Sequence, residues 1–586
     1  MLEALHLVAD ASRLLDKGNP QKAESTWLRA VQIDPRCSLG WMALTEFYES
    51  EKRVQDGLRA LSRWMATSER TAQTLFNQGS KSCALHNYEQ GKPLLLEALQ
   101  MDASLKIPVE EALAKVDCLQ KNWEQAILRC NEILKANPDN LEALRVRFSC
   151  WNAISFVPEE VADHRHLLRV KPDVERHSRL LFMLNYLAQT TPEQIYEESV
   201  QWSKLYADPL AAEILPHSNR PDPERRLKVA YLSPDLYTHA IMKLLPVVFE
   251  KHDHENFEVF AYSLSHRQDE FTEYVQQKFE NRFVELPLCR KTIADRVRSD
   301  GIDILVDLAG HTMHTDAYLA FATKPAPVQV SWLGVLSTTG LKTMDYFLGD
   351  AYIPCPGTEH LFTEKAYRLP RAGCAYRPPG DPGVSDPPCI KNGYITFGCY
   401  NAPRKVTVEV AKVWSIILHL NPGSKLHFKY HALDQEIAQR RIRGWFADYG
   451  IPMDRLMFEG DSPPLVYLAR YGEIDISLDP FPYHGGTTTL DALWMGVPVV
   501  SLSGRLTVSC SGVSNLTALG LPVAKTIEEY VAQANQLARD MPHTPNMRRE
   551  IRARMLQSDL LDEQGLVRAL ETAYREMWRT WCAQRS

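Results

Sequence analysis

The sequence predicts an α + α/β protein, in which a superhelix of tetratricopeptide-like repeats precedes two Rossmann-like domains. A 34-residue repeat occupies the first third of the chain, strands and helices alternate from residue 227 onward, and a Pro- and Gly-rich break divides that alternation into two blocks. The chain has 586 residues, of which 45% are apolar and 24% charged. It is therefore long enough for several domains that each bury a core.

Composition and charge argue against several classes of protein. The formal net charge of -7 argues against a nucleic-acid-binding protein, because phosphate binding needs a basic surface. The N-terminus carries Glu3 and Asp10 where a signal peptide would have Lys or Arg, and no apolar run approaches the roughly 18 residues of a membrane span. The twelve cysteines are scattered without a C-x-x-C pair, which indicates neither a disulfide framework nor a zinc ribbon. We therefore expect a soluble protein of a reducing compartment, the cytoplasm.

Two similar sequence segments reveal the repeat period in the first third of the chain. The residues AVQIDPR (30–36) return as ALQMDAS (98–104), two 34-residue periods later, and Pro138 and Pro172 are again 34 residues apart. A 34-residue period that closes on proline is typical of tetratricopeptide repeats, in which helix pairs stack into a superhelix. Small residues stand at the expected packing positions: Ala23, Ala30, Gly79, Gly91, Ala98 and Ala126. The alternative is a generic helical bundle, because the Trp-Leu-Gly-Tyr half of the repeat motif is poorly kept.

We expect the repeats to occupy residues 1–190 and a helical linker to occupy residues 191–226. The linker has Pro192 in a first helical turn and ends in LPHSNRPDPERR (215–226), which is rich in proline and charge. Repeat superhelices present a concave surface to a peptide or protein. The repeats therefore predict a protein partner, and they leave the oligomeric state open.

Short apolar, β-branched runs alternate with helical periodicity in the rest of the chain. The expected strands are LKVAYLSP, FEVFAYSL, RFVELP, DILVDLAG and PVQVSWLG before the break at residues 376–393, and YITFGCY, KLHFKY, RLMFEG, IDISLDP and PVVSL after it. Such alternation predicts parallel sheets with helices on both faces and ligands at the carboxyl ends of the strands. We expect an N-terminal Rossmann-like half at residues 227–385 and a C-terminal half, with the C-terminal helices, at residues 386–586.

The turn HGGTTT, between the strand IDISLDP and the helix-like TLDALWMG, predicts a site for a diphosphate. Gly485 and Gly486 let the backbone approach a ligand closely, and the free N–H groups and dipole of a helix N-terminus attract an anion. Three hydroxyl groups add donors at the same place: Thr487, Thr488 and Thr489. Asp491, one turn into the helix, is placed to reach sugar hydroxyls. The alternative is a single N-capping threonine after a flexible turn.

Five separated motifs carry a resemblance to a known family. They are LKVAYLSPDLYTHAI (227–241), KPAPVQVSWLG (324–334), MDYFLGD (344–350), ITFGCYNAPRKV (395–406) and LARYGEIDISLDPFPYHGGTTTLDALWMGVPVVSL (468–502). Together they resemble the O-GlcNAc transferase and SPINDLY family of glycosyltransferases, which join tetratricopeptide repeats to a GT-B catalytic region. The resemblance covers nearly the whole chain, and the glycine/threonine run is nearer the SPINDLY and bacterial pattern.

The resemblance also implies roles for individual residues. His239 stands where the family has a histidine that faces donor and acceptor, and Lys405 stands where a lysine meets the diphosphate, so both are catalytic candidates. Asn401, in the same loop as Lys405, and Tyr467, where the family often has a histidine that stacks on the base, are candidates for nucleotide-sugar binding together with the HGGTTT turn and Asp491. Two further histidines are expected to line the pocket: His311 and His484.

Two departures from the family pattern bear on specificity. Gly486 stands where human-type enzymes have a histidine, and residues 335–338 read Val-Leu-Ser-Thr where the family usually shows Tyr-Pro-Gly-Thr. The second change is expected near the sugar and the acceptor, so it leaves the identity of the sugar open.

The resemblance implies inverting transfer of a sugar, GlcNAc from UDP-GlcNAc, to Ser or Thr hydroxyls of a protein that the repeats recruit. The chain lacks the Asp-x-Asp after a strand that grips a metal in GT-A enzymes, so we expect no metal and no cofactor beyond the nucleotide sugar. The helix N-terminus and Lys405 would neutralise the leaving diphosphate instead. One alternative is GDP-fucose or another nucleotide sugar used on a bacterial surface or flagellar protein, and another is a catalytically inactive repeat scaffold. An NAD-dependent oxidoreductase is discounted, because no G-x-G-x-x-G follows the first strand of either block.

Overall fold

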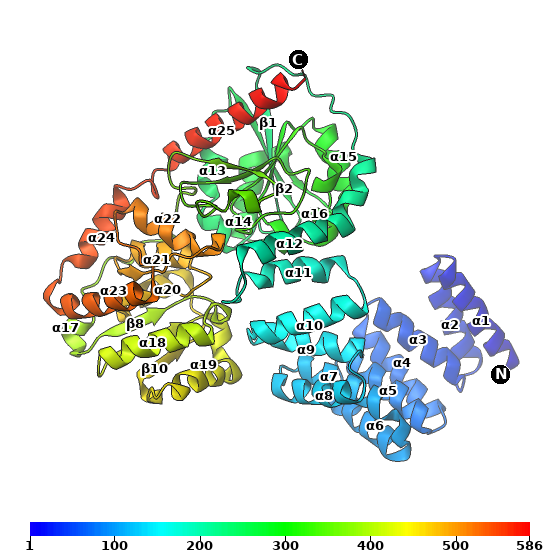
Figure 1. Ribbon diagram of the computed structural model, residues 1–586. Coiled ribbons are helices and arrows are strands. Elements are labelled where there is room, and N and C mark those ends of the chain that lie inside the picture. The colour runs from blue at the N-terminus through cyan, green and yellow to red at the C-terminus, as the bar shows by residue number, and fades with distance from the viewer. Residues whose placement is uncertain (586) are drawn as a thin grey trace. The chain divides into compact units, whose positions relative to one another are not determined.

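The computed structural model describes residues 1–585, and these fall into two compact units, one ending at Ala153 and the other beginning at Ile154 (Figure 1). This division falls inside the segment 1–190 that the repeats were expected to fill. The domain boundaries expected from the sequence stay predictions.

The first unit consists of helices that pack in consecutive pairs. They are α1 (Leu2–Asp16), α2 (Pro20–Ile33), α3 (Ser38–Ser50), α4 (Val54–Thr67), α5 (Ala72–Ala84), α6 (Tyr88–Met101), α7 (Lys106–Leu119), α8 (Trp123–Ala136) and α9 (Leu141–Ala153). The second helices of the pairs begin at Pro20, Val54, Tyr88 and Trp123, which are 34 or 35 residues apart. The helical repeat expected from the sequence is therefore confirmed.

A close approach of α5 and α6 explains two of the small residues, Gly79 and Gly91. A Cβ atom on Gly91 of α6 would lie 2.3 Å from the Cys83 sulfur and 2.9 Å from the Gly79 carbonyl oxygen of α5. No side chain fits in that space, so glycine is required where these two helices cross.

The second unit begins with three helices and continues into two parallel sheets. The helices are α10 (Val157–Val170), α11 (Val174–Leu184) and α12 (Pro192–Trp202). Thr191 and Gln194 form a capping box at the start of α12, with Pro192 in its first turn as the sequence predicted.

The first sheet has the strand order β3-β2-β1-β4-β5-β6-β7, with parallel pairing throughout. The strands are β1 (Leu227–Ser233), β2 (Phe257–Ser263), β3 (Phe283–Glu285), β4 (Ile304–Asp307), β5 (Val328–Ser331), β6 (Tyr346–Gly349) and β7 (Lys365–Arg368). The helices of this half are α13 (Pro246–Lys251), α14 (Glu270–Phe279), α15 (Arg290–Ser299) and α16 (Thr315–Tyr318). Apolar cores lie on both faces of the sheet.

The second sheet has the order β10-β9-β8-β11-β12 and is also parallel. The strands are β8 (Thr396–Cys399), β9 (Lys425–Lys429), β10 (Leu456–Glu459), β11 (Ile476–Leu478) and β12 (Val499–Val500). The helices are α17 (Cys389–Asn392), α18 (Val408–Leu420), α19 (Glu436–Asp448), α20 (Pro464–Ala469), α21 (Thr487–Trp494), α22 (Ser511–Ala518), α23 (Ile527–Asp540), α24 (Met547–Leu556) and α25 (Glu563–Ala583). All ten expected strands form, which confirms the two parallel α/β blocks.

Three elements differ from the sequence-based expectation. Strands β6 and β7 were not predicted, and β7 carries a charged residue at each end. The last helix, α25, follows the second block in sequence but packs on the first sheet, where Leu570, Tyr574 and Trp578 join its core (Figure 1).

Among residues 1–585, no helix is long and apolar enough to cross a membrane.

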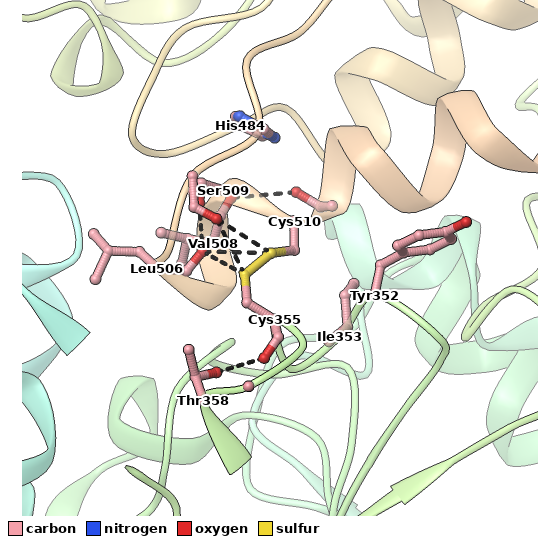
Figure 2. The surroundings of a disulfide bond; sticks show 12 residues. Tyr352, Ile353, Cys355, Thr358, His484, Leu506, Val508, Ser509 and Cys510 are labelled. Atoms are coloured by element: carbon pink, nitrogen blue, oxygen red, sulfur yellow. Dashed lines mark hydrogen bonds between the residues drawn. A yellow bond between two sulfur atoms is a disulfide. The ribbon is translucent and has the colours of Figure 1, made fainter. Parts of the chain in front are cut away.

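The scattered cysteines indicated no disulfide framework, yet Cys355 and Cys510 are bonded to each other (Figure 2). Their Cα atoms lie 6.1 Å apart although 155 residues separate them in sequence. Cysteine spacing could not show this pairing, since the contact is created by the packing of the two α/β halves. The other ten cysteines, all within the described residues 1–585, are not disulfide-bonded.

The packing of α5 against α6 gives a test of the repeat architecture. Gly91→Ala should destabilise the first unit by about 1–3 kcal/mol, because the added methyl group overlaps α5. Gly444→Ala on α19 is the matched control, since a Cβ there meets nothing within 4 Å, and it should be neutral or stabilising by up to about 1 kcal/mol. Urea unfolding followed by far-UV circular dichroism measures both. Equal or greater stability of the Gly91 variant would show that the helices do not cross as closely as described.

Candidate active site

A cavity of about 460 Å³ lies between the carboxyl ends of the two sheets. Its wall on the first half comes from segments that follow β1, β4, β5 and β6, and its wall on the second half comes from the β8 loop, the β11–α21 turn and α22. Polar residues on the first wall are Asp235, His239, Thr312 and Asp350, and those on the second wall are Lys405, Thr487, Ser511, Ser514 and Asn515. A cavity at this edge is where parallel α/β sheets bind their ligands.

The turn after β11 is held in place by hydrogen bonds to a buried carboxylate. Asp479 accepts hydrogen bonds from the Gly485 N–H (2.7 Å) and from the Ser501 hydroxyl (2.7 Å). Burial raises the pKa of Asp479. A Cβ on Gly485 would lie 2.5 Å from the hydroxyl oxygens of Thr488 and Thr489, so the turn packs tightly against the first turn of α21.

The N-terminus of α21 faces the cavity. Gly486 occupies the N-cap position and provides no side-chain cap, so the first N–H groups of the helix are left for a ligand. Gly486 and Thr487 line the cavity. The other two threonines do not: the Thr488 hydroxyl donates to the Asn401 side-chain oxygen (2.8 Å), and Thr489 is buried. The three hydroxyl groups therefore do not act as equal donors, because helix geometry turns each in a different direction.

Lys405 lies beside this helix N-terminus on the same wall, at the end of the turn Pro403–Lys405 after β8. Its ammonium donates to the His484 carbonyl (2.6 Å) and to the Asn401 side-chain oxygen (3.4 Å), and it lies 4.4 Å from the centre of the Tyr483 ring. Burial lowers the pKa of Lys405 to about 8, and the negative charge of Asp479 opposes this shift. A partly desolvated cation beside an open helix N-terminus is a strong anion site.

His239 follows β1 on the opposite wall and lines the same cavity. Its Nδ1 accepts a hydrogen bond from the Ile241 N–H (3.4 Å), and the Asp235 carboxylate lies 4.0 Å from the same nitrogen. The side chain is 43% exposed. With Nδ1 as an acceptor, a neutral ring carries its proton on Nε2 and can donate a hydrogen bond.

The two histidines that were expected to line the pocket have structural roles. The His484 ring is fully buried, donates from Nε2 to the Leu502 carbonyl (2.8 Å) and accepts the Gly512 N–H at Nδ1 (3.2 Å). Although His484 borders the cavity, it is the carbonyl that binds Lys405. His311 does not line the cavity: it bonds to Ser178 and to the Thr339 carbonyl, and burial lowers its pKa to about 4.

Asp491 and Tyr467 also lie outside the cavity lining. The Asp491 side chain is 1% exposed and accepts hydrogen bonds from the Lys243 ammonium (2.7 Å) and the Tyr376 hydroxyl (2.6 Å). Tyr467 packs against Tyr400 and bonds to the Tyr471 hydroxyl. Both residues were expected to bind the nucleotide sugar, but sequence spacing could not show that their polar groups are engaged within the protein.

Several cavity residues were missed by sequence reasoning. Ser511, Ser514 and Asn515 come from the start of α22, where the Ser-rich stretch TVSCSGVSN after β12 was a signal for them. Val335 and Leu336, which replace the family's usual Tyr-Pro, do line the cavity and give it an apolar side.

The arrangement can bind an anion at one wall and a hydroxyl compound at the other. Lys405, the open N-terminus of α21 and the Thr487 hydroxyl supply positive charge and donors on the second half. Asp235 and His239 face them from the first half. Within residues 1–585, no cluster of three or more His, Cys, Asp or Glu side chains is placed to hold a metal ion.

Comparison with known proteins identifies the family. The model of glycosyl transferase family 41 matches residues 205–372 and 389–570, which is more than half of the chain and includes the polar residues named above for both walls of the cavity. The chain belongs to glycosyl transferase family 41.

Similar proteins agree with this family assignment. A probable UDP-N-acetylglucosamine–peptide N-acetylglucosaminyltransferase SPINDLY of Solanum lycopersicum is 34% identical over 429 residues, covering 71% of this chain and 45% of that protein. A UDP-N-acetylglucosamine–peptide N-acetylglucosaminyltransferase of Caenorhabditis elegans is 24% identical over 535 residues, covering 70% of this chain and 46% of that protein. The chain thus spans about half the length of the curated relatives that it matches.

A solved structure extends the likeness to nearly the whole chain. A lysine-to-methionine variant of the O-GlcNAc transferase of Thermobaculum terrenum matches with a TM-score of 0.75 and 31% identity, covering 89% of this chain and 100% of that one. This chain therefore has the expected fold, a helical repeat region followed by a GT-B pair of α/β halves.

The lowered pKa of Lys405 predicts a pH dependence of anion binding. The ammonium is charged below pH 8 and loses its charge above it, so affinity for a fully ionised nucleoside diphosphate should be constant between pH 7 and about 8 and fall by up to about tenfold per pH unit above that. Calorimetric titration at a series of pH values measures this. Lys405→Arg should give a flat profile, because arginine stays protonated. A flat profile of the unaltered protein up to pH 9.5 would contradict a role for this ammonium.

Of the three threonines in the turn, Thr487 is the one that lines the cavity, so its hydroxyl is expected to contribute to nucleoside diphosphate binding. Thr487→Val should weaken nucleoside diphosphate binding by the loss of one charge-assisted hydrogen bond, roughly 1.5–3 kcal/mol. Thr517→Val, at an exposed position on α22, is the control and should bind as the unaltered protein does. Both affinities are read by calorimetry. Equal affinity of the two variants would remove the Thr487 hydroxyl from the site.

Proposed function

We propose that the protein is a nucleotide-sugar-dependent protein O-glycosyltransferase that works without a metal ion. The observation that carries this proposal is the placement of Lys405 beside the open N-terminus of α21 on one wall of the cavity. Membership of glycosyl transferase family 41 and the names of its relatives support the same reaction class.

The leaving diphosphate would be stabilised by the second half. As the bond between the anomeric carbon and the diphosphate breaks, negative charge grows on the phosphate oxygens. Preorganised donors at that point stabilise the transition state more than the ground state, and they are the Lys405 ammonium and the N–H groups at Gly486 and Thr487. To bind the phosphate, Lys405 would exchange its bond to the His484 carbonyl for one to the anion, which is a stronger partner.

The acceptor hydroxyl would approach from the first half. His239 is placed to donate from Nε2 and so to orient a bound sugar or hydroxyl, while the Asp235 carboxylate faces the cavity and is the candidate to accept the hydroxyl proton. Direct displacement from the face opposite the diphosphate inverts the anomeric carbon. The helical repeats would recruit the protein that carries the hydroxyl.

The proposed donor is UDP-GlcNAc, after the activity named for the relatives, with GDP-fucose as the alternative. A thermal-shift panel of UDP, GDP, UDP-GlcNAc, UDP-glucose and GDP-fucose, with and without a chelator, separates the two. A ligand at 100 times its dissociation constant should contribute about 2.7 kcal/mol. A chelator-insensitive shift with UDP compounds supports the proposal, a shift with GDP compounds alone supports the alternative, and no shift with any of them supports an inactive scaffold.

Lys405→Ala should abolish sugar transfer and leave the fold intact, because the variant loses the cation of the leaving-group site. Transfer is measured as the mass gain of an acceptor protein, and folding by circular dichroism. Lys412→Ala, at an exposed position on α18, is the control and should transfer normally. Unchanged turnover of the Lys405 variant would remove the lysine from the mechanism.

A further inference from the structure

The disulfide between Cys355 and Cys510 joins the two α/β halves at the edge of the cavity. Cys355 lies in the loop after β6 of the first half, and Cys510 is the N-cap residue of α22 in the second half. Figure 2 shows the bond between the loop that carries Ile353 and the turn that carries Ser509. The two sulfur atoms thus tie together segments that approach each other only when the halves are packed as they are here.

Both cysteines are immediate neighbours of cavity residues. Ile353 lines the first wall two residues before Cys355, and Ser511 lines the second wall directly after Cys510. A hydrogen bond crosses between the same two segments, from the Ser514 hydroxyl to the Asp350 carboxylate (2.6 Å). Asp350 also accepts the N–H groups of Tyr352 and Ile353, so it shapes the loop that leads to the disulfide. The separation of the two walls is therefore set at this point by one covalent and one hydrogen bond.

The surroundings of the sulfur atoms suit the reduced form as well as the oxidised one. The Leu506 carbonyl oxygen lies 3.2 Å from the Cys355 sulfur and 3.7 Å from the Cys510 sulfur. Two thiols at these positions would find an S–H acceptor already in place. Both cysteines are buried, with exposed fractions of 4% and 3%, but Pro356 and Gly357 beside Cys355 and Gly504 and Arg505 before Cys510 are exposed. A small dithiol can therefore reach the bond after a local movement of these turns.

We propose that Cys355 and Cys510 form a redox-controlled crosslink that fixes the two walls of the donor cavity. A dithiol reductant cleaves the S–S bond by thiol–disulfide exchange: the bond accepts two electrons and two protons and becomes two thiols, while the dithiol is oxidised to a disulfide. An oxidant of the disulfide class restores the bond by the reverse exchange.

Reduction would leave the Ser514–Asp350 hydrogen bond to hold this edge of the cavity. The reduced protein then samples states in which the two halves have separated, and its apparent affinity for a cavity ligand falls with the fraction that remains closed. The oxidised protein is pre-organised for the ligand. The inference adds redox control to the proposed function, and its first readouts need no nucleotide.

The test starts with the unliganded protein before and after dithiothreitol. Titration of thiols in denaturant should give ten groups before reduction and twelve after it. Hydrogen exchange should then show faster exchange, by about tenfold or more, in residues 350–358 and in α22 of the reduced protein. Cys355→Ser/Cys510→Ser should exchange as the reduced protein does in either condition. Cys289→Ser, which removes a free thiol on the first half, should respond to dithiothreitol as the unaltered protein does.

Nucleotide affinity supplies the second readout, with UDP and GDP as the probes. Reduction should raise the dissociation constant of the bound nucleotide several-fold in the unaltered protein and in Cys289→Ser, and should have no effect on the double variant. Twelve thiols after treatment with oxidised dithiothreitol would show that the crosslink does not form. If the protein has ten thiols before reduction but its hydrogen exchange is unchanged by reduction, the bond forms but does not control the separation of the walls. Either result overturns the inference, whereas absent nucleotide binding with the expected exchange overturns only the proposed function.

Discussion

The site depends on the buried carboxylate of Asp479, which holds the turn after β11 in place. By accepting the Gly485 N–H and the Ser501 hydroxyl, it joins the turn to β12 and fixes the point from which α21 starts. The same turn presents the His484 carbonyl to Lys405. A single buried group thus places both the helix N-terminus and the cation, and the space around it admits no larger residue: a Cβ on Gly512 would lie 2.7 Å from the Asp479 carboxylate. The desolvation cost of burying that carboxylate is partly offset by its two hydrogen bonds.

The cavity has its functional groups divided between the two halves, so its geometry depends on how the halves are held together. Asp491 of α21 binds Lys243 and Tyr376 of the first half, Ser514 of α22 binds Asp350, and the disulfide adds a covalent link. Buried charged contacts of this kind contribute specificity of arrangement more than net stability. The polar groups of the two walls face each other only while these contacts persist.

Local sequence patterns were sufficient to predict the repeats, the two parallel blocks and the turn at α21. The 34-residue period, the strand–helix alternation and the HGGTTT run each reflect structure formed by neighbouring residues. Strand β11 and the helix after it, α21, lie where the sequence predicted them.

What could not be predicted depends on contacts between distant segments. The Cys355–Cys510 bond, the packing of α25 on the first sheet and the pairing of Asp491 with Lys243 all join residues that are far apart in sequence. The expectation for His311 failed for a related reason. A histidine that follows a strand can point into the cavity, as His239 does, or into the core, as His311 does.

The central claim is that one cavity binds a diphosphate between Lys405 and the N-terminus of α21. A crystal structure of the protein with bound UDP or GDP tests it most directly. The account predicts phosphate oxygens within hydrogen-bond distance of the Thr487 N–H and of the Lys405 ammonium, with the bond from Lys405 to the His484 carbonyl broken or shared. A diphosphate bound elsewhere, or bound in the cavity while Lys405 points away from it, would contradict the account.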